Sequence, residues 1–85
     1  EIDIIAQDGV TLVFVEVKTR DGDRFGTGVE AVTSLKRRRL VSLAHDYIVR
    51  HRAADRPCRF DVVSVQLGER GPDIEVFRNA FSESE

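Results

Sequence analysis

Two acidic residues and a lysine near the start of the chain have the types and spacing of a metal-dependent phosphodiester-cleaving site. Asp3, Glu16 and Lys18 form the pattern Asp-x₁₂-Glu-x-Lys. Carboxylate oxygens suit Mg²⁺ or Mn²⁺, which keep water ligands and share coordination with phosphate. A nearby lysine orients or deprotonates the attacking water, or holds phosphate charge. We therefore expect Asp3 and Glu16 to bind the metal, and all three residues to be catalytic.

A tight hairpin is expected to bring these residues together. Residues 1–6 and 11–18 are strand-like runs rich in apolar residues, and Asp8-Gly9 lies between them. Asp-Gly between two such runs predicts a two-residue turn of type I′.

This turn fixes which side chains meet. In the expected register Asp3 pairs with Phe14, and Glu1 pairs with Glu16. Because alternate side chains of a strand share a face, Asp3 lies on the same side as Glu16, diagonally across the ladder. Two or three carboxylates and the ammonium of Lys18 then gather at the open end of the hairpin.

Such a gathering of like charges is unfavourable without a counter-ion. Carboxylates opposite one another destabilise a sheet by up to about 1 kcal/mol, and a divalent cation reverses the sign of that interaction. The alternative is a solvent-facing strand on which Glu16 and Lys18 pair incidentally. The pattern by itself leaves both interpretations open.

The rest of the chain predicts a loop, one helix and two more strands. Apolar residues recur at helical spacing after Thr33, which is a plausible N-cap. The expected ranges are a loop at 19–29, a helix at 33–50 or 33–51, and strands at 60–67 and 73–78. The element order β-β-α-β-β predicts an α/β fold, with a mixed sheet and the helix on one face.

A cluster of positive charge opens the predicted helix. Lys36, Arg37 and Arg38, together with Arg20, are candidates for binding nucleic acid through its phosphates. For the arginines the alternative is solvated surface charge. Lys36 falls on the inward side of the helix, where it either bends over the carboxylates or keeps a buried stem. Asp61 stands within an apolar strand and is expected to fix the sheet through a hydrogen bond or ion pair.

Composition bounds the class of protein. Eighty-five residues, 41% of them hydrophobic, suit one domain with an ordinary core, here spanning 1–85. One cysteine excludes an internal disulfide and a multi-thiolate zinc site within this sequence. No apolar run reaches the roughly 20 residues of a membrane helix. With a single cysteine and no visible signal peptide, a reducing cytoplasm is the expected location. The chain has no methionine and opens on a strand pattern, which predicts a preceding N-terminal segment.

The same residues resemble a known family. The run from Glu1 to Ala6, the segment from Leu12 to Arg20, and the later stretches 31–36, 58–63 and 79–81 are similar to the YraN-like uncharacterised proteins of bacteria. The resemblance implies a restriction-endonuclease-like, PD-(D/E)XK nuclease core related to Holliday-junction resolvases. The family's N-terminal helix is absent from this sequence.

The resemblance also implies roles and partners. Asp3 and Glu16 match the family's two acids and Lys18 its lysine. DNA, branched or otherwise structured, is then the expected partner, Mg²⁺ or Mn²⁺ the cofactor, and a homodimer the expected assembly. Two alternatives stay open: a non-catalytic nucleic-acid-binding or assembly module with the same fold, and a protein-interaction domain that binds neither metal nor DNA.

Overall fold

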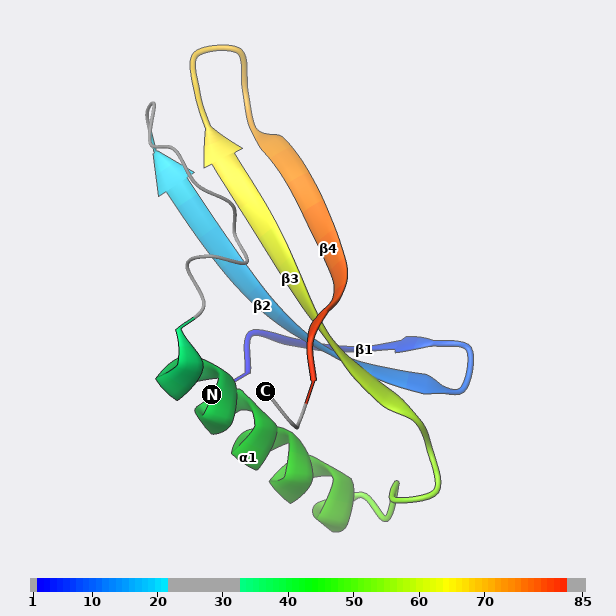
Figure 1. The fold of residues 1–85 in the computed structure, drawn as a ribbon. Coiled ribbons are helices and arrows are strands. Elements are labelled where there is room, and N and C mark those ends of the chain that lie inside the picture. Colours follow the sequence, from blue (N-terminus) through cyan, green and yellow to red (C-terminus); the bar gives the residue numbers. More distant parts are fainter. Residues whose placement is uncertain (1, 22–32, 83–85) are drawn as a thin grey trace.

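The part of the chain that the structure describes folds into one four-stranded sheet with a helix on one face (Figure 1). The computed structural model describes residues 2–21 and 33–82. Its elements are β1 (Ile4–Asp8), β2 (Thr11–Asp21), α1 (Ser34–Arg50), β3 (Cys58–Leu67) and β4 (Asp73–Phe81). The strands lie in the order β1-β2-β3-β4; β2 and β3 are parallel, and the two outer pairs are antiparallel. The predicted mixed sheet and element order are confirmed.

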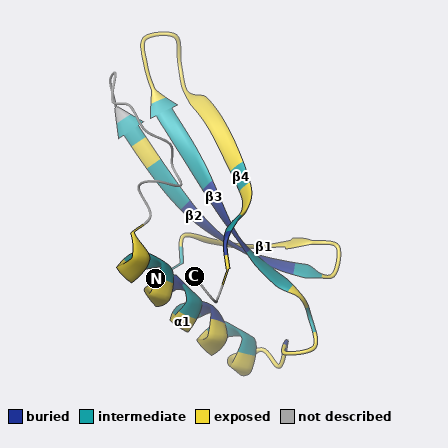
Figure 2. Ribbon diagram, viewed as in Figure 1, coloured by how far each residue is buried: buried dark blue, intermediate teal, exposed yellow. Residues whose placement is uncertain are grey.

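The core lies between α1 and one side of the sheet. Strand alternation turns Leu12 and Phe14 toward the helix from β2, and Phe60 and Val62 from β3. From α1, Leu40 and Ala44, one helical turn apart, pack against these four residues. Ala53, which follows the helix, and Phe81 of β4 complete the core. In Figure 2 the buried residues gather where the strands cross above the helix. We call the side of the sheet that carries these core residues the helix-facing side.

The helix begins and ends with hydrogen-bonded caps. The Oγ1 atom of Thr33 accepts a hydrogen bond from the backbone N–H of Lys36 at 3.2 Å, so the predicted N-cap is confirmed. At the other end, the N–H of His51 donates to the carbonyl of Tyr47 at 3.0 Å. The helix therefore ends at Arg50, the shorter of the two predicted limits.

The predicted register of the β1–β2 hairpin is wrong by two residues. Asp8 pairs with Thr11, so the two turn residues are Gly9 and Val10 rather than Asp8 and Gly9. Gly9 has a φ of 61°, and a positive φ at the first turn residue alone is typical of a type II′ turn. A slip of two residues leaves every side chain on its predicted face, because side chains alternate with period two.

Several strand limits also differ from the prediction. Pairing of β2 with β3 runs from Leu12–Cys58 to Asp21–Leu67, so the first residues of the predicted loop continue β2. The strand is longer than predicted because backbone hydrogen bonds to β3 continue through polar residues, which show no apolar pattern in the sequence. The strand β1 begins at Ile4, β3 begins earlier, and β4 ends later, at Phe81. Glu1 and residues 22–29 of the predicted loop lie outside the described residues.

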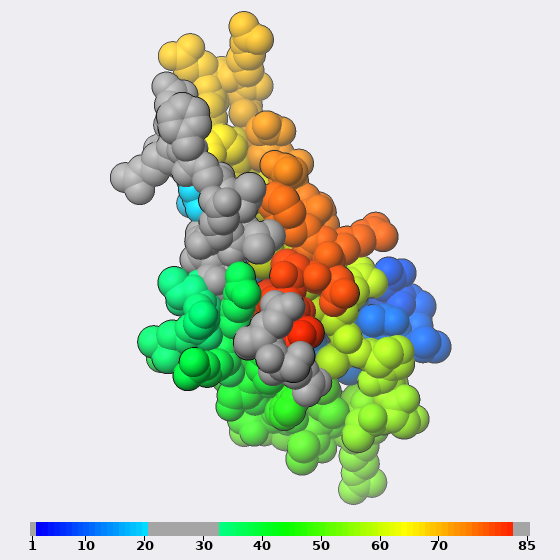
Figure 3. Space-filling model, viewed as in Figure 1, coloured from blue at the N-terminus to red at the C-terminus, as the bar shows by residue number. Residues whose placement is uncertain are grey.

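The molecule is elongated, with principal extents of 44 × 27 × 18 Å. The far ends of β2, β3 and β4 extend beyond α1, and the β3–β4 hairpin projects furthest from the helix (Figure 3). Within 2–21 and 33–82, no helix has the length and apolar character needed to cross a membrane.

Candidate metal and phosphate site

Glu16 is a buried carboxylate on the helix-facing side of β2. It follows Phe14 in the strand alternation, so its side chain points toward α1, and the residue is only 4% exposed. The Nζ atom of Lys36 lies 2.7 Å from its Oε2 atom. Despite this ion pair, Oε2 receives no hydrogen bond of acceptable geometry. A buried oxygen in this state has capacity left for another positive ligand.

Asp3 lies just before β1, and its side chain accepts a hydrogen bond from β2 where the pairing of the two strands has ended. Its Oδ2 atom accepts a hydrogen bond from the backbone N–H of Val17 at 2.9 Å, an amide beyond the last β1–β2 pair. A contact with the carboxyl group of Glu16, together with this N–H, holds the pKa of Asp3 below its usual value. The two acids therefore lie together, as the sequence predicted.

Two lysines neutralise these acids. Lys36 reaches them from the first turn of α1, and Lys18 lies on β2 with its Nζ 4.0 Å from Oε2 of Glu16. The Lys36 ammonium and partial burial lower the pKa of Lys18, whereas contact with Glu16 raises the pKa of Lys36. Of the two, Lys18 gives up its proton more readily.

The residues present fit a divalent metal that keeps several waters. Within 2–21 and 33–82, no group of three or more histidine, cysteine, aspartate or glutamate side chains is placed to hold a metal. Asp3 and Glu16 offer two carboxylates, of which that of Glu16 is buried and already lies 2.7 Å from the ammonium of Lys36. Mg²⁺ is commonly bound by one or two carboxylates plus water and substrate phosphate.

Comparison with known proteins places the chain among its relatives. A sequence profile described as "Uncharacterised protein family UPF0102" matches residues 1–65. A UPF0102 protein of Symbiobacterium thermophilum is 56% identical over 85 residues, covering 95% of this chain and 70% of that protein. The chain belongs to the UPF0102 family. A member from Nitrosomonas europaea is 46% identical over 84 residues, covering 99% of this chain and 70% of that protein.

Family membership confirms the predicted link to uncharacterised bacterial proteins. All four residues of the site, Asp3, Glu16, Lys18 and Lys36, fall inside the segment that the UPF0102 profile matches. The names of the UPF0102 relatives state no activity, ligand or partner.

The predicted nucleic-acid-binding residues of this UPF0102 chain are spread over several environments. Lys36 bends over the carboxylates, which settles its direction in favour of the first of the two alternatives. Arg37 places its guanidinium 5.5 Å from the ring centre of Phe81, so it also has a packing role that the sequence did not reveal. Arg38 is exposed on α1, and Arg20 is half-buried in β2. Their binding of nucleic acid stays a prediction.

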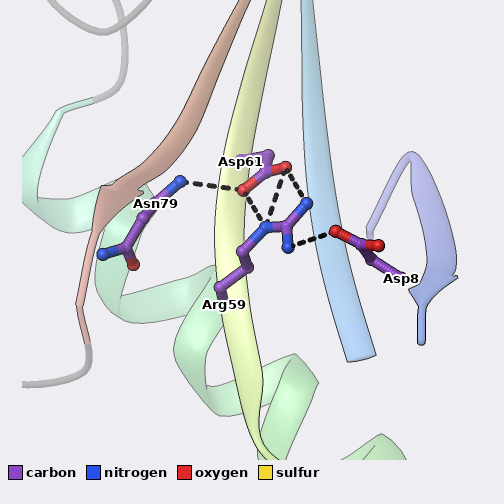
Figure 4. A network of polar contacts seen from close by, with 4 residues as sticks. All are labelled: Asp8, Arg59, Asp61 and Asn79. Carbon is purple, nitrogen blue, oxygen red and sulfur yellow. Dashed lines mark hydrogen bonds and ion pairs between the residues drawn. The ribbon is translucent and has the colours of Figure 1, made fainter. Parts of the chain in front are cut away.

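A second polar network, which holds the sheet together, lies on the opposite side from the helix (Figure 4). Asp61, buried in β3, accepts hydrogen bonds from Nε of Arg59 at 3.0 Å and from the backbone N–H of Asn79 at 2.9 Å. Nη1 of Arg59 in turn lies 2.9 Å from Oδ2 of Asp8. The expected structural role of Asp61 is confirmed. The network of Asp61, Arg59, Asp8 and Asn79 links β3 to both β1 and β4.

The same network explains an irregularity in β4. Asn79 has a φ of 52°, and the β3–β4 register shifts between Phe60 and Val62. An extra residue in one strand leaves an amide without a ladder partner. The carboxylate of Asp61 accepts from that amide, so it stabilises the bulge. An acidic residue within an apolar strand was the only sequence signal for this feature.

Proposed function

We propose that this domain is a metal-dependent endonuclease that hydrolyses phosphodiester bonds of DNA. The observation that carries the proposal is the buried carboxylate of Glu16, whose Oε2 atom lacks a hydrogen bond and lies among Asp3 and two lysines. Asp3 and Glu16 would hold Mg²⁺ or Mn²⁺. The metal, when bound, supplies Lewis-acid activation of phosphate and water.

The chain's own residues divide the remaining work. The Val17 N–H fixes one oxygen of Asp3 and favours its ionised form. Lys18 lies beside Glu16 on β2, where it would orient the attacking water. Lys36 supplies positive charge for the phosphate group. The roles of Asp3 and Lys18 are those expected from the sequence pattern, and Lys36 adds a second lysine to it.

The fold class proposed with this function is restriction-endonuclease-like. A hairpin that carries two acids, followed by a helix and a parallel strand, supports this assignment. By the family resemblance, the proposed substrate is branched or structured DNA, and the proposed active assembly is a homodimer, as for resolvases. The chain covers about 70% of the length of the two UPF0102 relatives compared above, and the proposed activity is that of the whole protein.

One observation favours a second candidate function. Within the described ranges only two carboxylates meet at the site, and lysines already neutralise both. A non-catalytic module that binds nucleic acid through positive charge requires no more than this. Activity measurements separate the two candidates.

The deciding experiment tests the full-length protein on linear, nicked and four-way-branched DNA. We expect cleavage with Mg²⁺ or Mn²⁺, and none after chelation by EDTA, because the carboxylates require the metal to activate water. Binding of all three DNAs with no cleavage in either metal would support the non-catalytic module. Absence of both binding and cleavage would overturn the assignment to nucleic acid.

We also predict that the start of α1 contacts DNA phosphates. Arg38→Ala should reduce the slope of log affinity against log salt by about one unit, because each phosphate contact releases about one counter-ion. The loss should be similar for different sequences, since phosphate contacts carry no sequence information. Fluorescence anisotropy at several salt concentrations, without divalent metal, measures both effects.

Arg70→Ala is the matched control, because Arg70 is exposed in the β3–β4 connection, away from α1. It removes the same charge and should leave the slope unchanged. Equal slopes for wild type and Arg38→Ala would show that Arg38 is solvated surface.

A further inference from the structure

The four charged groups of the site balance one another without any metal. Asp3 and Glu16 contribute two negative charges, and Lys18 and Lys36 contribute two positive charges. Lys36 makes the closest of the ion pairs, 2.7 Å from the buried Oε2 atom of Glu16, compared with 4.0 Å for Lys18. A divalent cation that binds Glu16 must therefore share or take the position that Lys36 now holds.

We propose that Lys36 is a displaceable counter-ion: a divalent metal drives it from Glu16, and the released ammonium then binds a phosphodiester of the nucleic acid. This inference rests on the proposed function, because it assumes that Asp3 and Glu16 bind the metal. It adds an ordered link between metal binding and substrate binding at the same site.

Electrostatics favour the displacement. Adding a doubly charged cation to a balanced cluster leaves an excess of two positive charges beside two ammonium groups. Like charges a few ångströms apart repel one another strongly at the intermediate dielectric of a protein surface. A phosphodiester supplies the negative charge that the cluster then lacks.

Lys36 is better placed to move than Lys18. Its side chain is 39% exposed and leaves the first turn of a helix, whereas that of Lys18 is 24% exposed and leaves an inner strand of the sheet. A lysine stem is long and flexible, so the ammonium of Lys36 can turn toward solvent while α1 stays in place. The first helical turn contains no acidic residue, so it presents no repulsion to an incoming phosphate.

The arrangement gives the metal-free protein and the metal-bound protein different surfaces. Without metal, Lys36 neutralises Glu16 and so reduces the repulsion between the two carboxylates. With metal, the same charge becomes available to DNA. Metal and DNA should then strengthen each other's binding by the same factor, since linkage is reciprocal.

The first test measures Mn²⁺ affinity of the full-length protein by calorimetry without DNA. Lys36→Gln removes the competing cation and should tighten Mn²⁺ binding about tenfold, equivalent to about 1.4 kcal/mol. Arg39→Gln is the matched control, because it removes one charge from an exposed position of the same helix. Its Mn²⁺ affinity should equal that of the wild type.

The outcomes of this test separate the two proposals. If Glu16→Gln and wild type bind Mn²⁺ equally, or neither binds it, the metal site itself is overturned and the displacement with it. If binding depends on Glu16 but Lys36→Gln keeps the wild-type affinity, only the displacement is overturned.

A second measurement needs no substitution. Lys18 and Lys36 are the only lysines of this chain, so amine labelling followed by peptide mass spectrometry reports each one separately. Saturating Mn²⁺ should raise the labelling rate of Lys36 several-fold, and added duplex DNA should then lower it again. An unchanged rate for Lys36 with bound Mn²⁺ would overturn the displacement, and a lack of protection by DNA would overturn the phosphate contact.

Discussion

Glu16→Gln should abolish Glu16-dependent Mn²⁺ binding and reduce metal-dependent cleavage about a thousandfold, equivalent to ~4 kcal/mol in the barrier. Gln keeps the shape of the buried side chain but removes the negative charge that a hard cation requires. Folding should be little affected, because the side chain of Lys36 is 39% exposed and can turn to solvent once its partner is neutral. Calorimetry with Mn²⁺, a gel assay of DNA cleavage and a thermal melt measure the three quantities.

Two further variants sharpen this result. Asp3→Asn should also lose Mn²⁺ affinity, while its side-chain carbonyl still accepts from the N–H of Val17 and preserves the start of the hairpin. Glu69→Gln makes the same chemical change as Glu16→Gln at an exposed turn position, and should leave metal binding and cleavage intact. Cleavage by Glu16→Gln at the wild-type rate would eliminate Glu16 from the mechanism.

Asp61→Asn should lower the free energy of unfolding by about 3 kcal/mol, because removing one partner leaves buried polar groups without their acceptor. The carboxylate of Asp61 accepts from Arg59 and from the bulged Asn79 amide together (Figure 4). An amide in its place directs an N–H₂ group toward one of these donors. Urea denaturation followed by circular dichroism measures the loss.

The control for this substitution lies at the outer end of the same network. Asp8→Asn weakens the contact with Arg59 at a side chain that is 59% exposed, and should change stability far less than Asp61→Asn. Neither variant should alter Mn²⁺ affinity, because the network lies on the opposite side of the sheet from Glu16. A stability loss for Asp61→Asn no larger than that for Asp8→Asn would show that burial of this carboxylate is unimportant.

The sequence alone determined the local features of this protein. Apolar periodicity and the cap at Thr33 predicted the helix to within one residue, and strand alternation placed Asp3 on the same side of the sheet as Glu16. Both rest on backbone geometry, which repeats over a few residues and is therefore readable from neighbouring positions. The face assignment even tolerated the two-residue error in the hairpin register, since the strand period is two.

Tertiary structure alone decided which distant groups meet. The contact of Lys36 with Glu16 joins α1 to β2, and the cation–π contact of Arg37 with Phe81 joins α1 to β4. Asp61 finds the amide of Asn79 18 residues further along the chain, and Arg59 finds Asp8 51 residues away. Helical spacing left two directions open for Lys36, and no local pattern encodes the other pairs, because they depend on the order of strands in the sheet and on where the helix packs across it.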